Sequence, residues 1–425
     1  MTATPADSAS TTTSSYVNLQ RTQSLLEERN WPAIVATSAE NVTYVTGYDN
    51  WTIYTFKDLQ AYGVITYDGK LAAILPIDAL DYVAERPLPV HDIRVYGAYH
   101  IAVDPAGRFS PAEERLRVAR DTLPCYPDAP TALAACLGEL GCTRTDAVGV
   151  ELRSLPASAT SQLAEALAFL RIDDATDDLR WIRQIKTPRE IERLRTAAEI
   201  NETAFQTAIT SSWQHPLSEA DLESIFRSEV ARRGAQPGHW ETSVGTRAAG
   251  CFPASDATPR PNDLMRSDTG CRWRGYWSDT GRSFCFGKPS EKAQRIYAGL
   301  REGYDAGTTL LRPGVSPTEI FETTVATIRD HGIPDYTRHH VGHAIGLEMY
   351  ETPLLRPRPQ APSIHSLGSP DDRIEVGMVV NFEVPFYELG FGGLQIEDTF
   401  VITEKGAELL TELPRDLVQL PLAGQ

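Results

Sequence analysis

Two pairs of acidic residues in the C-terminal half of the chain restrict its possible folds more than any other feature. Asp268 precedes Asp279 by eleven residues in SDTGCRWRGYWSD, and the midpoint of this pair lies beside a glycine. Glu383 and Glu397 repeat this symmetry within a second glycine-rich segment. Residues placed symmetrically about a chain reversal face each other across antiparallel strands, with Cβ atoms about 5 Å apart. The sequence therefore predicts two hairpins that each bring two carboxylates together.

Each of these acidic pairs needs a compensating positive charge, because opposed like charges destabilise a sheet and buried carboxylates are costly when unpaired. Divalent cations would supply that charge. His343, in HHVGHAIGLEMYETP, offers a nitrogen ligand, and Gly342 and Gly346 allow close backbone approach. Two metal ions about 3.5–4 Å apart polarise a carbonyl and lower the pKa of a shared water. The pattern predicts a two-metal hydrolytic site whose oxygen ligands and imidazole suit Mn²⁺, Fe²⁺, Co²⁺ or Zn²⁺.

Composition and charge exclude several other classes of protein. With 425 residues and 41% hydrophobic side chains, the chain can fill more than one core. Its formal charge of −17 disfavours nucleic acid and anionic membrane surfaces as partners. The sequence contains neither an apolar run of about eighteen residues nor a secretory signal, so we expect a cytoplasmic protein. Six scattered cysteines without a C-x-x-C pair exclude a zinc ribbon.

The order of predicted elements divides the chain into four segments, namely 1–16, 17–182, 183–415 and 416–425. The first segment is rich in Ser, Thr and Ala and is predicted to be a disordered tail. An α/β domain follows, in which Asp68-Gly69 predicts a hairpin closed by a type I′ turn. The next segment opens with a helix start at Thr187-Pro188 and alternates helices with strands, as an α+β domain does. The last segment is assigned to a C-terminal tail.

Four segments resemble the signature segments of one enzyme family. RSDTGCRWRGYWSDTGRSF, HHVGHAIGLEMYETP, GMVVNFEVP and GGLQIEDTFVIT are similar, in order and spacing, to those of the creatinase/aminopeptidase P/methionine aminopeptidase family, the M24-type pita-bread metallopeptidases. IKTPREIERLRTAAEI and NVTYVTGY resemble the interdomain helix and a segment of the N-terminal domain in its creatinase and Xaa-Pro peptidase members. The resemblance spans about 20–415. It implies an α+β fold, with a pita-bread catalytic domain after a smaller creatinase-like α/β domain.

The same resemblance implies the chemistry of the site. Two divalent metal ions would be held by the residues on which the family's ligands fall, namely Asp268, Asp279, His343, Glu383 and Glu397. A hydroxide bridging the metals would attack an amide carbonyl, while Glu383 handles the proton. His339 matches a substrate-contacting histidine of the proline-specific branch. The implied reaction is cleavage of an Xaa-Pro bond at the N-terminus of a short peptide, by an enzyme that forms a homodimer.

Two positions depart from the family pattern. The family usually places a histidine about seventeen residues before its first metal aspartate, where this chain has Cys251, and another seven residues after the metal histidine, where it has Tyr350. A phenol can donate a hydrogen bond to an oxyanion but does not titrate near pH 7, since its ordinary pKa is about 10. Tyr350 is therefore a candidate catalytic donor. The candidates for the substrate pocket are Cys251, Phe252, Arg282 and His365.

Three functions are compatible with these residues. The first is a metal-dependent Xaa-Pro aminopeptidase or dipeptidase, which the complete metal set and His339 favour. The second uses the same metals on a small metabolite, hydrolysing an amide, amidine or cyclic C–N bond as in ectoine hydrolysis, or eliminating across one as a lyase does. The two replaced histidines favour this second function. The third is a catalytically silent binding protein that retains the site.

Overall fold

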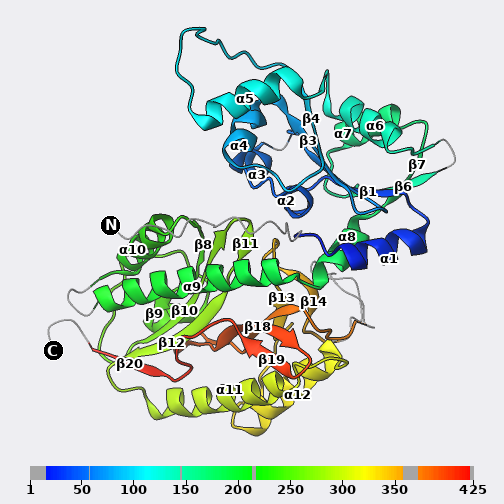
Figure 1. The fold of residues 1–425 in the computed structure, drawn as a ribbon. Helices are drawn as coiled ribbons and strands as arrows, with labels where there is room; N and C mark the ends of the chain where they lie inside the picture. The colour runs from blue at the N-terminus through cyan, green and yellow to red at the C-terminus, as the bar shows by residue number, and fades with distance from the viewer. Residues whose placement is uncertain (1–15, 57, 144–145, 213–216, 358–371, 422–425) are drawn as a thin grey trace. The chain divides into compact units, whose positions relative to one another are not determined.

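The computed structural model divides the chain into two units, Met1–Leu179 and Arg180–Gln425 (Figure 1). It describes residues 16–56, 58–143, 146–212, 217–357 and 372–421. Most of the expected N-terminal tail lies outside these residues, but Tyr16, its last position, is buried. The division falls three residues before the expected boundary at 182–183, and helix α8 (Thr176–Gln184) runs across it. No helix among the described residues combines the length and apolar character needed to cross a membrane.

The first unit is an α/β domain built on a seven-stranded sheet with the strand order β5-β4-β3-β2-β1-β6-β7. Only β2 runs antiparallel to its two neighbours; the other pairings are parallel. The strands are β1 (Ala33–Ala36), β2 (Tyr62–Thr66), β3 (Leu71–Pro76), β4 (Asp92–Tyr96), β5 (Cys125–Tyr126), β6 (Ala147–Val150) and β7 (Arg171–Asp174). The helices are α1 (Leu19–Arg29), α2 (Ala39–Thr46), α3 (Trp51–Thr55), η1 (Ile77–Ala79), α4 (Leu80–Glu85), α5 (Pro111–Thr122), α6 (Ala129–Glu139) and α7 (Ala157–Ala166).

The hairpin predicted at Asp68 joins β2 and β3, but with a different turn. The backbone N–H of Thr66 donates to the carbonyl of Lys70 at 3.0 Å, which leaves a three-residue loop. Gly69 has φ +82°, whereas Asp68 does not adopt a positive φ. A loop of this length needs one left-handed residue rather than the two of a type I′ turn.

The second unit contains a sheet that carries the polar residues of interest and is antiparallel except where β20 pairs with β12. Its main path has the order β11-β10-β12-β18-β15-β13-β14, while β8 and β9 pair with β10, β19 pairs with β18, and β20 pairs with β12. The strands are β8 (Gln236–Trp240), β9 (Ser243–Val244), β10 (Leu264–Trp273), β11 (Tyr276–Trp277), β12 (Thr280–Phe286), β13 (Gly342–Ala344), β14 (Glu351–Leu354), β15 (Val379–Glu383), β18 (Glu397–Thr403), β19 (Gly406–Leu409) and β20 (Val418–Leu420). A separate hairpin pairs β16 (Phe386–Glu388) with β17 (Gly392–Leu394), and η2 (Gly245–Ala249) follows β9.

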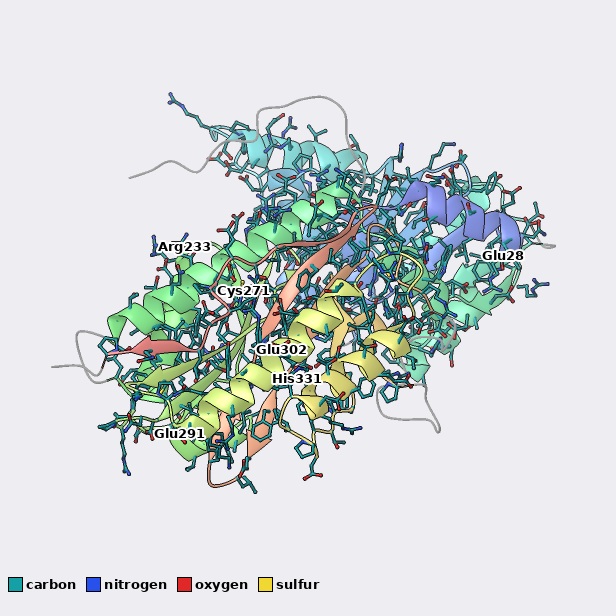
Figure 2. All side chains as sticks on the ribbon, turned by 90° about the horizontal axis from the view of Figure 1, so that it is seen from below. Glu28, Arg233, Cys271, Glu291, Glu302 and His331 are labelled. Atoms are coloured by element: carbon teal, nitrogen blue, oxygen red, sulfur yellow. The ribbon has the colours of Figure 1, made fainter. Side chains whose placement is uncertain are left out.

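Two helix pairs cover this sheet and create two apolar cores. Helices α9 (Pro188–Ser211) and α10 (Glu219–Arg232) pack over β8 and β10, with Phe205, Phe226 and Trp240 in the core between them. Helices α11 (Glu291–Thr309) and α12 (Pro317–Asp330) lie side by side in Figure 1 and Figure 2 and enclose a second core around Phe382. The helix start predicted at Thr187-Pro188 is confirmed, because Thr187 and Glu190 form a capping box there. A sheet between two helix layers is therefore the frame of the site.

The two acidic hairpins form, but only one has the predicted register. Glu383 and Glu397 are directly opposed across β15 and β18. In the first hairpin Asp268 opposes Gly281 rather than Asp279, because the turn is centred on Arg274-Gly275. Both turn residues have positive φ, +48° and +88°, as a two-residue type I′ turn requires. The predicted register is wrong by two residues. Because side chains alternate between the two faces of a strand, a shift of two residues leaves both aspartates on the same face of the sheet.

The expected C-terminal tail is wrong for part of its length. Val418–Leu420 form β20, which pairs in parallel with Phe284–Phe286 of β12. Leu420 is buried in the core below α9 and α10, and this apolar contact orders the segment.

A buried ion-pair network holds the second unit together on the sheet face opposite the acidic pairs. Asp398 is 0% exposed and accepts hydrogen bonds from Arg282 at 2.6 Å, Tyr304 at 2.6 Å and Thr411 at 2.6 Å. Arg415 adds a bond of 2.6 Å to the same carboxylate. Burial alone would raise the pKa of Asp398, but Arg282 and Arg415 outweigh it and lower the pKa. The carboxylate is thus ionised and fully paired.

The substitution Asp398→Asn should destabilise the second unit by about 3–5 kcal/mol, because it leaves buried guanidinium groups without their counter-charge. We expect a melting temperature about 10 °C lower by calorimetry. The pKa of Asp398 is lower in the folded than in the unfolded state. The extra stability of the wild type over the variant should therefore be present above the unfolded-state pKa of about 4, and it should disappear as the pH falls through the folded-state pKa. The matched control is Glu223→Gln, which breaks an exposed pair with Arg227 and should cost about 0–1 kcal/mol. Equal melting temperatures for the two variants at neutral pH would contradict this role.

Candidate metal centre

Five neighbouring strands bring the predicted ligands to one face of the sheet. Asp268 lies on β10, Asp279 directly precedes β12, and His343 lies on β13. Glu383 ends β15 and Glu397 begins β18. Since β10, β12, β18, β15 and β13 are consecutive neighbours, side chains separated by more than a hundred residues in sequence converge.

The donor atoms form two clusters that share Asp279. One cluster contains Asp279, His343 and Glu397; the other contains Asp268, Asp279 and His239. Within each cluster the donor atoms lie within 4.8 Å of one another. Asp279 Oδ2 is 3.6 Å from His343 Nε2, and Asp279 Oδ1 is 3.2 Å from His239 Nε2. The Asp279 carboxylate therefore faces two imidazoles, one with each of its oxygen atoms.

Glu383 lies beside these clusters and is not a member of either. Its Oε1 atom contacts Arg338 Nη2 at 3.2 Å and His340 Nδ1 at 3.0 Å. Burial raises the pKa of Glu383, Arg338 opposes this, and the Asp268 carboxylate raises it further. Glu383 is thus a buried carboxyl group with a raised pKa at the edge of the candidate centre.

The electrostatics of the clusters fit a divalent cation. Burial raises the pKa of Glu397 well above its ordinary value, and Asp268 and Asp279 raise it further. For Asp279, burial is outweighed by His239 and His343, which lower its pKa. Asp279 Oδ1 nevertheless has no hydrogen-bond partner among the described residues. A buried oxygen that accepts no hydrogen bond, beside carboxylates that repel one another, is a donor that a hard or borderline cation satisfies.

Neighbouring amides fix the orientation of the carboxylates. Asn381 Nδ2 donates to Glu397 Oε1, and Gln395 Nε2 donates to both Glu397 Oε2 and Asp268 Oδ2, the last at 3.1 Å. Gly281 leaves the space these groups need, since a Cβ there would lie 2.6 Å from Glu397 Oε2. Such partners of ligand groups commonly set the geometry of a metal site.

The structure places the other predicted catalytic residues unequally. Tyr350 stacks on His343, with ring centroids 3.8 Å apart, and burial raises the pKa of its phenol. It is therefore a neutral hydrogen-bond donor beside the candidate centre. His339 is exposed and packs edge-on against His340 at 4.3 Å. The buried His340, which was not singled out from the sequence, is the histidine that contacts Glu383.

The predicted pocket residues separate into three groups. Cys251 and Phe252 are exposed; Cys251 Sγ lies 3.7 Å from Arg266, and Arg247 lies over the Phe252 ring. Arg282 is not in a pocket, because strand alternation turns it to the opposite face, where it bonds Asp398 and the carbonyl of Glu397. His365 lies outside the described residues.

Sequence reasoning missed His239, which the structure places against the metal candidates. Its Nε2 atom is 2.9 Å from Asp268 Oδ1. Burial would lower the pKa of His239, but Asp279 and Asp268 outweigh it and raise the pKa to about 10. A lone histidine in QPGHW gave no periodic signal; only the pairing of β8 with β10 brings it to the site.

The substitution Asp279→Ala should abolish tight metal binding, because this residue belongs to both clusters. Elemental analysis after gel filtration should find metal in the wild type and almost none in the variant. The variant's metal-free form should melt lower than the wild type's, because His239 and His343 lose the carboxylate that they share, and added metal should no longer raise its melting temperature. Asp305→Ala, which removes an exposed carboxylate paired with Arg301, should leave both measurements unchanged. Retention of stoichiometric metal by the Asp279 variant would overturn this assignment.

Comparison with known proteins agrees with this geometry. Residues 192–404 match the metallopeptidase family M24, and residues 18–185 match the creatinase/prolidase N-terminal domain. An Xaa-Pro dipeptidase of Pyrococcus furiosus is 30% identical over 253 residues, which are 59% of this chain and 68% of the relative. An Xaa-Pro dipeptidase of Lactobacillus delbrueckii is also 30% identical over 252 residues, covering 59% of this chain and 66% of the relative.

Solved structures share the two-domain fold. An Xaa-Pro dipeptidase from Bacillus anthracis superposes with a TM-score of 0.74 at 24% identity, over 95% of this chain and 99% of that one. An X-Pro aminopeptidase from Thermotoga maritima gives a TM-score of 0.70 at 19% identity, over 95% and 99%. The expected fold, a creatinase-like domain followed by a pita-bread domain, is confirmed. The chain therefore belongs to metallopeptidase family M24 and is a metal-dependent hydrolase.

Proposed function

We propose that the chain is a dinuclear metallopeptidase that hydrolyses the Xaa-Pro bond of short peptides. The observation that carries this proposal is the pair of donor clusters joined by Asp279, because one carboxylate facing two imidazoles suits two adjacent cations. Divalent ions bound there would polarise the scissile carbonyl and lower the pKa of the attacking water. The relatives named Xaa-Pro dipeptidase support the choice of bond.

Glu383 is the residue best suited to move the proton. Its raised pKa and its contacts with Arg338 and His340 let it accept a proton from the attacking water at neutral pH and release it to the departing amine nitrogen. Tyr350 contributes a neutral phenol beside His343, which can stabilise the negative charge that develops on the carbonyl oxygen. Water attack, proton transfer and charge stabilisation are thus divided among different groups.

A second function, hydrolysis of an amide or ring C–N bond in a small metabolite, is favoured by one observation. The groups at Cys251 and Tyr350 are a thiol and a phenol, and partial desolvation raises the pKa of both. Neither exchanges a proton readily at neutral pH, as an imidazole would. The replacement of the family's usual histidines at these two positions therefore favours a substrate other than a peptide. Homodimer formation and a cytoplasmic location stay predictions.

A panel of Xaa-Pro dipeptides and tripeptides tests the first function. Protein loaded with Mn²⁺ or Co²⁺ should release proline from the dipeptides, chelator should abolish the activity, and added metal should restore it. Peptides with proline first serve as the negative control. Absence of turnover across the panel, with bound metal shown by elemental analysis, would reject the Xaa-Pro peptidase and leave the metabolite hydrolase.

Two substitutions at Tyr350 test the role of its hydroxyl group. Tyr350→Phe keeps the ring on His343 but removes the donor, and should lower kcat about 100-fold without changing metal content. Tyr350→His should raise peptidase activity, because it introduces a group that titrates near pH 7. Tyr336→Phe is the matched control, since the Tyr336 hydroxyl donates to the Pro385 carbonyl and Tyr336 belongs to neither donor cluster. A Tyr350→Phe enzyme as fast as the control would exclude the phenol from the chemistry.

A further inference from the structure

His239 reaches the site because its strand carries an extra residue. Trp240 pairs with Thr269 and Pro237 pairs with Cys271, so Gly238 and His239 together oppose the single residue Gly270. Such a bulge re-aims a side chain, and bulges occur often beside active sites. Trp240 meanwhile packs into the core, with its ring 5.1 Å from Phe226. Because of the bulge, Trp240 packs in the core while the adjacent His239 faces the site.

Gly270 makes the room that the imidazole occupies. A Cβ at this position would lie 2.3 Å from His239 Cε1 and 2.7 Å from His239 Nδ1. Any other residue would displace the ring. Nδ1 of His239 is buried and has no hydrogen-bond partner among the described residues, so packing against Gly270 and contacts at Nε2 orient the ring. Only Nε2 is directed at charged groups.

The contacts of Nε2 are those of a metal ligand. It lies 2.9 Å from Asp268 Oδ1 and 3.2 Å from Asp279 Oδ1, and the side chain of His239 is only 16% exposed. The other cluster has the same composition, since His343 Nε2 lies 3.6 Å from Asp279 Oδ2. Each half of the site thus contains one imidazole nitrogen, and the two halves share one carboxylate.

We propose that His239 is a ligand of the second metal ion, binding it through Nε2 together with Asp268 and Asp279. This inference rests on the dinuclear site of the proposed function and adds a sixth protein ligand to the five expected from the sequence. Because imidazole suits Zn²⁺, Co²⁺ and Fe²⁺ better than it suits Mn²⁺, the second position should prefer these borderline ions. The competing role is a permanent imidazolium that neutralises the two aspartates without touching a metal.

Metal titration of the whole chain distinguishes the two roles. Metal-free wild type should bind about two Co²⁺ ions per chain. His239→Ala should keep the ion held by His343 and Glu397 but bind the second at least about 100-fold more weakly, in competition with a chelating indicator. His239→Asn should behave in the same way. His331→Ala is the matched control: this exposed histidine directly follows α12 (Figure 2) and belongs to neither donor cluster, so its loss should change neither affinity.

A second readout uses the wild type and does not depend on a variant that folds. In the Co²⁺-loaded protein, proton NMR should show two strongly shifted imidazole N–H signals that exchange with water. The signal from His343 should exchange more slowly, because its Nδ1 atom lies 3.0 Å from the Ala344 carbonyl, while His239 Nδ1 has no such partner in the described part of the chain.

Two results would overturn the proposal: unchanged affinity for both ions in a folded His239→Ala protein, or a single shifted imidazole in the fully loaded wild type. Neither measurement uses a peptide. If the protein cleaves none of the Xaa-Pro peptides, His239 can still be a metal ligand. If His239 proves not to be a ligand, any peptidase activity that is measured still supports the proposed function.

Discussion

The repulsion among buried carboxylates on one sheet face is the constraint on which the rest of the second unit depends. Asp268, Asp279, Glu383 and Glu397 come from neighbouring strands, and burial raises the pKa of Glu383 and of Glu397. Two imidazoles and one guanidinium offset part of the charge. Divalent cations, the cofactors of a metal-dependent hydrolase, would neutralise the negative charge that remains.

The opposite face of the same sheet solves a related problem with protein groups alone. Asp398 follows Glu397 directly, and strand alternation sends the two carboxylates to opposite sides. Arg282, Tyr304, Thr411 and Arg415 satisfy Asp398 completely. The charge of Asp398 is therefore balanced by protein groups. On the other face, Asn381 and Gln395 orient the Glu397 carboxylate, while burial and the neighbouring aspartates raise its pKa.

Backbone features supply the space that this crowding requires. Gly281 makes room for the Glu397 carboxylate, and Gly270 makes room for the His239 ring. At the hairpin turn, Arg274 and Gly275 adopt the left-handed conformation that sets the register of β10 against β12. The ligands thus converge only because other positions, the glycines and the turn residues, give the backbone the shape that the ligand side chains require.

The sequence by itself determined the two-domain α/β and α+β organisation and the family, because motif order and spacing can be read along the chain. Its resemblance to that family also predicted five metal residues. Glu383 and Glu397 were placed correctly, since their separation defines one reversal. Only the tertiary structure decided the two-residue register of the first hairpin, the pairing of β20 with β12, and the arrival of His239 from a bulged strand. It also moved Arg282 out of the expected pocket and into the Asp398 network. These features depend on which strands are neighbours in the sheet, and that pairing is fixed by long-range packing rather than by the local pattern of residues.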